Sequence, residues 1–230
     1  MVPAPDINNI SDDQLHMDVL PPATREAFFA VRTVDFLPCD RWYLAGGTAL
    51  ALQVGHRQSV DLDFFTPQGT FNTTNLERDL INTGLWATTS QDKGTLYGNL
   101  KGAKMSFIAY PFFKPSSHKL HCGSICILEP ADIAVMKIIA ISQRGKKRDF
   151  IDLYWYALNK ELLLPVIQRV TERYPGQEHN VPHFLKSLVY FADAEADPMP
   201  TLFFNADWKT IKAYFQKEIP KIAKELLRLE

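Results

Sequence analysis

Two aspartates, Asp61 and Asp63, stand one residue apart inside an apolar run that reads VDLDFF. Alternate side chains of an extended strand point to the same face, so the two carboxylates would project side by side, with their Cα atoms roughly 6–7 Å apart. Two unpaired anions beside a hydrophobic core are costly, and a shared divalent cation offsets that cost. The pair therefore predicts a Mg²⁺ (or Mn²⁺) site. The alternative is a polar edge strand on which both acids are simply solvated.

Upstream of this pair, Gly46, Gly47 and Thr48 follow a short strand-like segment and open a helical pattern. A helix N-terminus presents free backbone N–H groups and the positive end of the helix dipole, which together bind anions. Glycine permits a phosphate to approach the backbone closely, while Thr48 would cap the helix or donate to that phosphate. Thirteen residues separate Gly47 from Asp61, enough for the chain to cross back and place the phosphate beside the metal. Cations that bridge phosphates are the recurring device of nucleotidyl transfer.

A second polar segment, MKIIAISQRGKKRDFIDLYW, covers residues 136–155. Its pattern predicts an amphipathic helix that ends near Gly145, followed by a second helix on which Asp149 and Asp152 share a face. Judged by composition alone, the segment is a solvated surface whose aspartates pair with local cations. The cations between positions 137 and 148 are Lys137, Arg144, Lys146, Lys147 and Arg148.

The string YLAGGTALALQVGHRQSVDLDFF closely resembles the bacterial AbiEii/AbiGii-type nucleotidyltransferase toxins, which belong to the polymerase-β nucleotidyltransferase superfamily. The 136–155 segment resembles that family's second block, which runs Lys, spacer, Arg and then Arg-Asp-x-x-Asp-Leu. Together the two blocks extend the resemblance over roughly residues 42–158. It implies that Lys137 and Arg148 bind a nucleoside triphosphate.

The resemblance also implies the reaction and its partners. A Mg²⁺-dependent enzyme would move a nucleoside monophosphate from an NTP to a hydroxyl group and release pyrophosphate. The implied acceptor is RNA, with tRNA ends as the best-attested type, or protein, and the implied partner is an antitoxin encoded nearby. Asp149 and Asp152 would lie in the same cleft, where they orient cations or assist proton transfer. The expected catalytic residues are Asp61, Asp63, Lys137 and Asp152, and the expected nucleotide-binding residues are Gly46, Gly47, Thr48, Arg57, Ser59, Lys137, Arg148 and Asp149.

Three positions leave alternatives open. Arg57 would reach a phosphate or cap the end of the preceding helix. Ser59 would lie near the triphosphate or cap the start of the strand. A third carboxylate that the wider superfamily often carries falls here at Ser106, and no Asp or Glu occurs between residues 94 and 128. The general base is therefore open, with Asp149 or Asp152 as substitutes.

Two other functions remain possible from the sequence. The formal net charge of −1 provides no global basic field to attract nucleic acid, so a small acceptor of the antibiotic-modifying kind fits at least as well as RNA. The missing third carboxylate slightly favours a non-catalytic domain that binds a nucleotide or a partner.

The helices and strands expected around these residues indicate an α+β fold. Residues 1–129 read as a nucleotidyltransferase domain with a small mixed sheet flanked by helices, and residues 130–230 read as a helical domain that contributes to the cleft. We expect a helix over 11–34 with Ser11 as its cap, and strands in the segments 59–65 and 85–110.

Composition indicates an ordinary globular protein, with 46% apolar and 22% charged residues. Neither a signal peptide nor a membrane span is visible, so no membrane contact is expected. Three cysteines, an odd count, suggest no disulfide framework, and a reducing cytoplasm is the simplest setting. The segment HKLHCGSIC superficially resembles a zinc cluster, but Cys122 and Cys126 on an extended run would stand roughly 13 Å apart, so structural roles are favoured.

Overall fold

The structure, a computed structural model, describes residues 7–9 and 12–227 of the 230. Within the described residues, eight strands form one mixed sheet, and all of them precede Pro130. The predicted α+β class is therefore correct. The strands are β1 (Ile7–Asn9), β2 (Tyr43–Ala45), β3 (Leu62–Thr66), β4 (Trp86–Asp92), β5 (Thr95–Leu100), β6 (Ala103–Ala109), β7 (Lys119–Cys122) and β8 (Ile125–Leu128).

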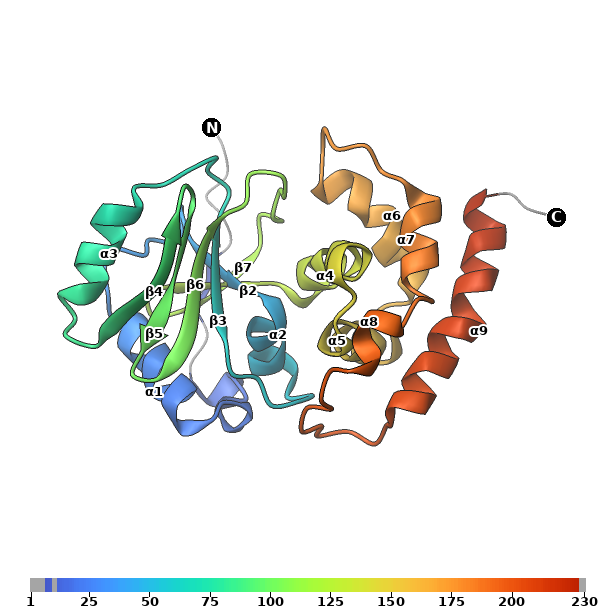
Figure 1. Cartoon of the computed structure of the whole chain (residues 1–230), viewed down its shortest axis with the longest axis horizontal. Helices are drawn as coiled ribbons and strands as arrows, with labels where there is room; N and C mark the ends of the chain where they lie inside the picture. Colours follow the sequence, from blue (N-terminus) through green and yellow to red (C-terminus); the bar gives the residue numbers. More distant parts are fainter. Residues whose placement is uncertain (1–6, 10–11, 228–230) are drawn as a thin grey trace.

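Helices cover the sheet and make up the regular structure that follows it. Figure 1 shows the sheet at the left, with α1 (Pro22–Val31) and α3 (Thr73–Ile81) outside it and α2 (Gly46–Val54) between the sheet and the C-terminal helices. Those later helices are α4 (Pro130–Arg144), α5 (Lys147–Asn159), α6 (Leu163–Arg173), α7 (Val181–Ser187), α8 (Ala192–Glu195) and α9 (Trp208–Leu227).

The pairing of the central strands brings candidate site residues together at one end of the sheet. The strand order is β1-β7-β8-β2-β3-β6-β5-β4. Ala45, the last residue of β2, lies opposite Asp63 of the antiparallel strand β3. On the other side of β3, the parallel strand β6 places Ser106 opposite the same Asp63. The glycine turn after Ala45, the carboxylate of Asp63 and the hydroxyl of Ser106 are thereby brought together.

Strand β3 follows the predicted alternation, but it begins later than expected. Leu62 and Phe64 are buried in the core, and Asp63 lies on the opposite face. Asp61 immediately precedes the strand, and Val60, which falls within the predicted strand segment 59–65, is 48% exposed. The two carboxylates therefore do not share a continuous strand; Asp61 approaches from the loop that leads into it.

The helix pair α4–α5 agrees with the sequence prediction. Pro130 occupies the first turn of α4, where its missing N–H has no intrahelical partner. Gly145 ends that helix in the left-handed region, with φ of 51°, and α5 begins two residues later. Lys137, Asp149 and Asp152 are nevertheless buried. The composition-based view of this segment as a solvated surface is therefore wrong for these three side chains.

The predicted helix over residues 11–34 is wrong in its first part. Residues 12–19 contain two 3₁₀ turns, Asp12–Gln14 and Met17–Val19, and the first α-helix starts only after Pro21. Ser11, its expected cap, lies outside the described residues. No helix within 7–9 and 12–227 is both long and apolar enough to cross a bilayer.

The cysteines also differ from the prediction. Cys39 and Cys126 form a disulfide across 87 residues, with their Cα atoms 5.2 Å apart. The odd cysteine count concealed this pair, because Cys122 is the unbridged thiol and is buried.

Candidate active site

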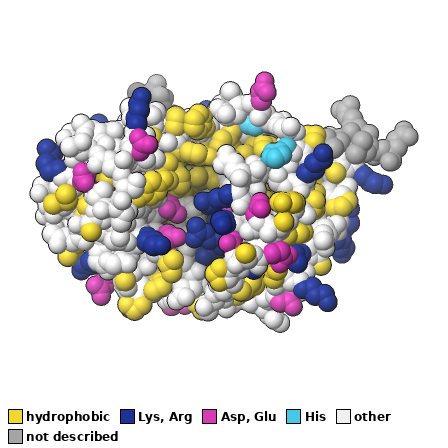
Figure 2. All heavy atoms as spheres, in the orientation of Figure 1, with side chains coloured by type: hydrophobic (Ala, Val, Ile, Leu, Met, Phe, Trp, Pro, Cys, Tyr) yellow, Lys and Arg dark blue, Asp and Glu magenta, His cyan; other side chains and the backbone are white. Residues whose placement is uncertain are grey.

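A cleft of about 370 Å³ opens between the sheet and the first C-terminal helices. Figure 2 shows Lys and Arg side chains beside Asp and Glu side chains in a hollow near the middle of the molecule. Every predicted site residue except Asp152 lines this cleft. The lining residues are Gly46, Gly47, Thr48, Arg57, Ser59, Asp61, Asp63, Phe65, Tyr97, Ser106, Ile108, Tyr110, Met136, Lys137, Ala140, Gln143, Arg144, Arg148 and Asp149.

Asp63 is the more buried carboxylate of the predicted metal pair. Its Oδ1 accepts a 2.6 Å hydrogen bond from Ser106 Oγ, and its Oδ2 abuts the glycine turn, because a Cβ on Gly46 would lie 3.2 Å away. Burial raises the pKa of Asp63, the bond from Ser106 opposes this rise, and the neighbouring charge of Asp61 adds to it. A bound cation would remove the cost of keeping this carboxylate ionised.

Asp61 is the more accessible carboxylate, with 24% of its side chain exposed. Its Oδ2 accepts a 3.0 Å hydrogen bond from Arg148 Nη1. The backbone carbonyl of Asp61 accepts a short hydrogen bond from Thr48 Oγ1, which also bonds to Ser59 Oγ at 2.8 Å. Thr48 and Ser59 thus fix the loop that carries Asp61. The predicted role of Thr48 as a side-chain helix cap is wrong, because α2 has no side-chain cap.

The glycine turn forms the N-terminus of α2 and faces the carboxylates. Gly46 adopts φ of +73°, in the left-handed region that side chains with a Cβ rarely adopt. A Cβ on Gly47 would lie only 2.1 Å from Arg57 Nη2, so the backbone here packs directly over that guanidinium. Both glycines are therefore required by local geometry, and the turn exposes the backbone N–H groups of the helix start to the cleft.

Asp152 is the centre of a buried ion cluster behind the cleft wall. Arg57 binds it in a bidentate manner, with Nε 2.5 Å from Oδ1 and Nη2 2.9 Å from Oδ2. His56 Nε2 lies 2.8 Å from Oδ1, and Lys137 Nζ lies 2.6 Å from Oδ2. Burial alone would raise the pKa of Asp152, but these partners outweigh it and hold that pKa well below its usual range. Such a carboxylate is a poor proton acceptor.

Lys137 joins this cluster to the cleft. Its ammonium group donates a 2.7 Å hydrogen bond to Asp149 Oδ1 as well as contacting Asp152. Asp149 Oδ2 is buried and accepts no hydrogen bond, although Arg144 Nε lies 3.4 Å away. Asp149 Oδ2 is therefore held only by the ion pair with Arg144, whereas both oxygens of Asp152 are hydrogen-bonded or ion-paired at 2.5–2.9 Å.

The structure also identifies residues that the sequence did not point to. His56 is buried against Asp152, and the backbone of residues 56–58 pairs with residues 201–203 of the C-terminal half. Tyr97, Tyr110 and Met136 give the cleft an apolar wall. The three adjacent aromatic residues of α5, Tyr154, Trp155 and Tyr156, do not line it. Alternation along β5 and β6 could have indicated the wall, but nothing local indicates the His56 contact.

The donors at one end of the cleft fit a divalent cation. Asp61 and Asp63 supply hard carboxylate oxygens, which Mg²⁺ prefers together with substrate phosphates. The glycine turn beside them supplies backbone donors for those phosphates, and two cations, Lys137 and Arg148, flank the same space. Ser106, the position where the resemblance led us to look for a third carboxylate, lies opposite Asp63 on β6.

Comparisons with known proteins identify several that are similar to this chain. A protein of Aquifex aeolicus (strain VF5), described as uncharacterized, is 35% identical over 185 residues, which cover 79% of this chain and 87% of that protein. MenT4, a nucleotidyltransferase toxin of Mycobacterium tuberculosis, is similar in structure with a TM-score of 0.49 and 15% identity, covering 88% of this chain and 86% of its own. The Megavirus polyadenylate synthase gives a TM-score of 0.40 and 15% identity over 68% of this chain and 32% of its own.

The family profile described as "Nucleotidyl transferase AbiEii toxin, Type IV TA system" matches residues 30–95 and 116–226, well over half of the chain. The match includes both carboxylates, the glycine turn and the whole α4–α5 pair, while the unmatched residues include Ser106. The chain therefore belongs to the AbiEii family of nucleotidyltransferase toxins from type IV toxin–antitoxin systems.

Proposed function

We propose that this nucleotidyltransferase moves a nucleoside monophosphate from an NTP to a hydroxyl group, with Mg²⁺ (or Mn²⁺) held by Asp61 and Asp63. The observation that carries the proposal is the contact between Asp63 and the glycine turn, where a Cβ on Gly46 would lie 3.2 Å from Asp63 Oδ2. A metal on these carboxylates and a triphosphate on this turn would be direct neighbours. When bound, the metal would supply charge neutralisation and orientation of the phosphates.

The triphosphate would lie along the N-terminus of α2. Gly46 and Gly47 would donate backbone hydrogen bonds to its oxygens. Lys137, from the buried cluster, would contribute a fixed positive charge, and Arg148 a mobile one, since 46% of its side chain is exposed. Asp152, Arg57 and His56 would act as positioning residues that hold Lys137 and the turn in place. Asp149 would orient Lys137 and Arg144 from the cleft side.

The acceptor hydroxyl would arrive from the side of β5 and β6. Phosphoryl transfer places the attacking and leaving oxygens roughly in line, so the acceptor approaches opposite the pyrophosphate. A groove of about 350 Å³ on that side is lined by Asp61, Asp63, Tyr97, Asn99 and Lys104. Ser106 also lines this groove, in the place of the superfamily's third carboxylate. No separate base is assigned at this position, and Asp152 is unsuited to the role because its pKa is depressed.

We favour RNA, and tRNA ends in particular, over protein or a small molecule as the acceptor. A third groove of about 420 Å³ adjoins the cleft and is lined by Arg144, Lys146 and Arg148, whose side chains are 46–53% exposed. Each of the three is paired with a carboxylate, Arg144 with Asp149, Lys146 with Asp197 and Arg148 with Asp61. Positive charge for RNA would therefore come from Lys104 on the other side and from these cations once their exposed pairs open. Family membership supports an antitoxin as a further partner. Residues 1–129 and 130–230 would act as two domains that meet at the cleft.

Transfer of label from α-³²P NTPs tests this proposal. The full-length protein would be incubated with each NTP, Mg²⁺ and total tRNA, and the products separated on denaturing gels. Labelling of tRNA supports the proposal if that labelling is lost when EDTA is added and is also lost in the Asp63→Asn variant. Label on the protein or on a small acceptor would support the alternative acceptors. Nucleotide binding without transfer, unchanged in Asp61→Asn, would show a non-catalytic domain instead.

A further inference from the structure

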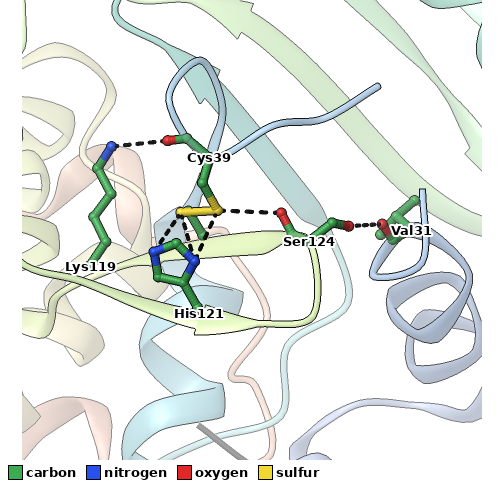
Figure 3. The surroundings of a disulfide bond; sticks show 6 residues. Val31, Cys39, Lys119, His121 and Ser124 are labelled. Atoms are coloured by element: carbon green, nitrogen blue, oxygen red, sulfur yellow. Dashed lines mark hydrogen bonds between the residues drawn. A yellow bond between two sulfur atoms is a disulfide. The ribbon is translucent and has the colours of Figure 1, made fainter. Parts of the chain in front are cut away.

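Three residues with metal-ligating side chains meet outside the cleft. Cys39 precedes β2, His121 lies on β7 and Cys126 lies on β8. One ligand atom of each lies within 4.8 Å of the other two. Figure 3 shows the imidazole of His121 pointing at the two bonded sulfur atoms. None of these three residues, called the Cys–His cluster below, lines the cleft.

The backbone fixes two members of the cluster independently of the disulfide. His121 and Cys126 are directly paired across the antiparallel β7–β8 hairpin. The hairpin turn is anchored to the end of α1, since the Ser124 N–H donates a 2.9 Å hydrogen bond to the Arg32 carbonyl. A Cβ on Gly123 would lie 2.5 Å from the same carbonyl, so the turn packs closely there. The pair therefore keeps its position when the sulfur–sulfur bond is broken.

The distances within the cluster match those of a zinc site. Bond lengths of about 2.3 Å for Zn–S and about 2.0–2.1 Å for Zn–N at a tetrahedral angle place sulfur and nitrogen about 3.6 Å apart. His121 Nδ1 lies 3.4 Å from Cys39 Sγ and 3.8 Å from Cys126 Sγ. We propose that Cys39, His121 and Cys126 bind Zn²⁺ when the disulfide is reduced.

Replacement of the disulfide by zinc needs only an added reductant, water and the metal ion. A phosphine reductant and one water convert the disulfide to two thiols and a phosphine oxide. Binding of Zn²⁺ then releases the two thiol protons, because the ligand is the thiolate. The sulfur atoms must separate to about 3.8 Å, the tetrahedral edge for two Zn–S bonds. Cys39 lies in the loop between α1 and β2, which can take up this movement. Three protein ligands leave a fourth position for water.

Zinc at this site would replace the covalent cross-link of the disulfide by a cross-link through the metal ion. In the disulfide form, Cys39 is joined covalently to the hairpin. In the reduced form, zinc would restore the same connection between the loop that leads into β2 and the strands at its side. Zinc should therefore raise the thermal midpoint of the reduced protein by more than that of the oxidised protein, in which only the cleft carboxylates would bind it. This expectation does not depend on the proposed catalytic function.

Titration of the whole protein with Co²⁺, as a spectroscopic substitute for Zn²⁺, tests the proposal. Protein reduced with a phosphine and kept anaerobic should bind one Co²⁺ per chain beyond any held by Asp61 and Asp63, and should develop a thiolate-to-cobalt charge-transfer band, which excess Zn²⁺ then bleaches. Carboxylates give no such band, so binding at Asp61 and Asp63 is distinguished. The oxidised protein should show no band. Cys39→Ser, Cys126→Ser and His121→Ala should each lose or greatly weaken it, while Cys122→Ser should retain it.

The comparison of reduced and oxidised wild-type protein keeps the test valid if a variant fails to fold. Absence of the band in reduced wild-type protein would overturn the proposal. Equal cobalt spectra before and after reduction would also overturn it. A full band in folded Cys126→Ser would show that other residues bind the metal.

Discussion

Arg148 Nη1 lies 3.0 Å from Asp61 Oδ2, so a cation expected to bind the triphosphate is paired with a carboxylate expected to bind the metal. Both groups are partly exposed, and pairs of this kind contribute little to stability, about 0–1 kcal/mol. The pair can therefore open when a metal–nucleotide complex arrives. Arg148 would exchange one anion for another, and Asp61 would exchange a guanidinium for a metal ion.

Replacement of Arg148 by alanine should lower kcat/KM for the NTP about 100-fold, as is typical when one preorganised charge at a transferring phosphate is lost. The free energy of unfolding should change by less than about 1 kcal/mol, because the pair is exposed. Steady-state kinetics and urea denaturation measure the two quantities. Arg78→Ala is the matched control, since Arg78 pairs with Asp79 on the surface and is 64% exposed. Equal activity of both variants would contradict the assigned role.

Replacement of Asp152 by asparagine should lower the free energy of unfolding by about 3–5 kcal/mol. The substitution leaves Arg57 and Lys137 buried without their shared counter-charge, and breaking a buried ion pair typically costs this much. Urea denaturation monitored by circular dichroism measures the change. Asp79→Asn, in the exposed surface pair, should change it by less than about 0.5 kcal/mol. A neutral effect of Asp152→Asn would exclude the clustered role described here.

Replacement of Gly47 by alanine should destabilise the protein by about 1–3 kcal/mol and impair nucleotide binding. The new methyl group would stand 2.1 Å from Arg57 Nη2, which cannot move away without breaking its bidentate bond to Asp152. Gly69→Ala is the control, because a Cβ at that position meets no atom within 4 Å. Thermal unfolding and equilibrium binding of an NTP measure both effects. Similar results for the two variants would place the glycine turn away from the site.

The pH dependence of metal binding should report Asp63. Its pKa is raised from 3.8, so in the metal-free protein the folded state holds this proton more tightly than the unfolded state does. Stability from this group is thus present at low pH and falls as pH rises through the interval between 3.8 and the raised value. Metal affinity runs the opposite way and weakens as pH falls through that interval, because metal and proton compete.

Asp152 affects the pH dependence of stability in the opposite direction to Asp63, so the two contributions can be separated. Its pKa is depressed, so its stabilising effect is present above about 3.8 and is lost as pH falls below that value. Urea denaturation and Mn²⁺ binding titrations, each repeated over a series of acidic pH values, distinguish the carboxylate of Asp63 from that of Asp152. The Asp63→Asn variant should bind Mn²⁺ far more weakly at every pH while it keeps the acid-induced loss of stability. A wild-type pH profile in that variant would show that another group controls the metal.

The sequence predicted the site residues that form a pattern of residue types at short spacing. Gly46, Gly47, Asp61 and Asp63 form a short-range pattern, and each lines the cleft. The role of Asp152 was less accessible, because its partners Arg57 and His56 lie 95 and 96 residues away and only the fold brings them together. Sequence alone cannot distinguish a carboxylate that faces substrate from one that is surrounded by cations.

The same limit applies to the sheet and the cysteines. The alternation of Leu62, Asp63 and Phe64 revealed a central strand, since one face is buried and the other is not. The edge strand β1 and its neighbour β7 are short, at three and four residues, and carry too little periodicity to be recognised. The Cys39–Cys126 pairing spans 87 residues and depends on the order of the strands, which no local pattern encodes.

The central claim is that Asp61 and Asp63 bind a divalent cation next to a triphosphate on the glycine turn. Crystals grown with Mn²⁺ and a non-hydrolysable NTP would test it most directly, through the anomalous signal of manganese. We predict a peak within metal–oxygen bonding distance of both carboxylates, with the triphosphate against Gly46 and Gly47 and with Arg148 released from Asp61. A nucleotide bound elsewhere, or a triphosphate on the turn with no manganese at the carboxylates, would contradict the account.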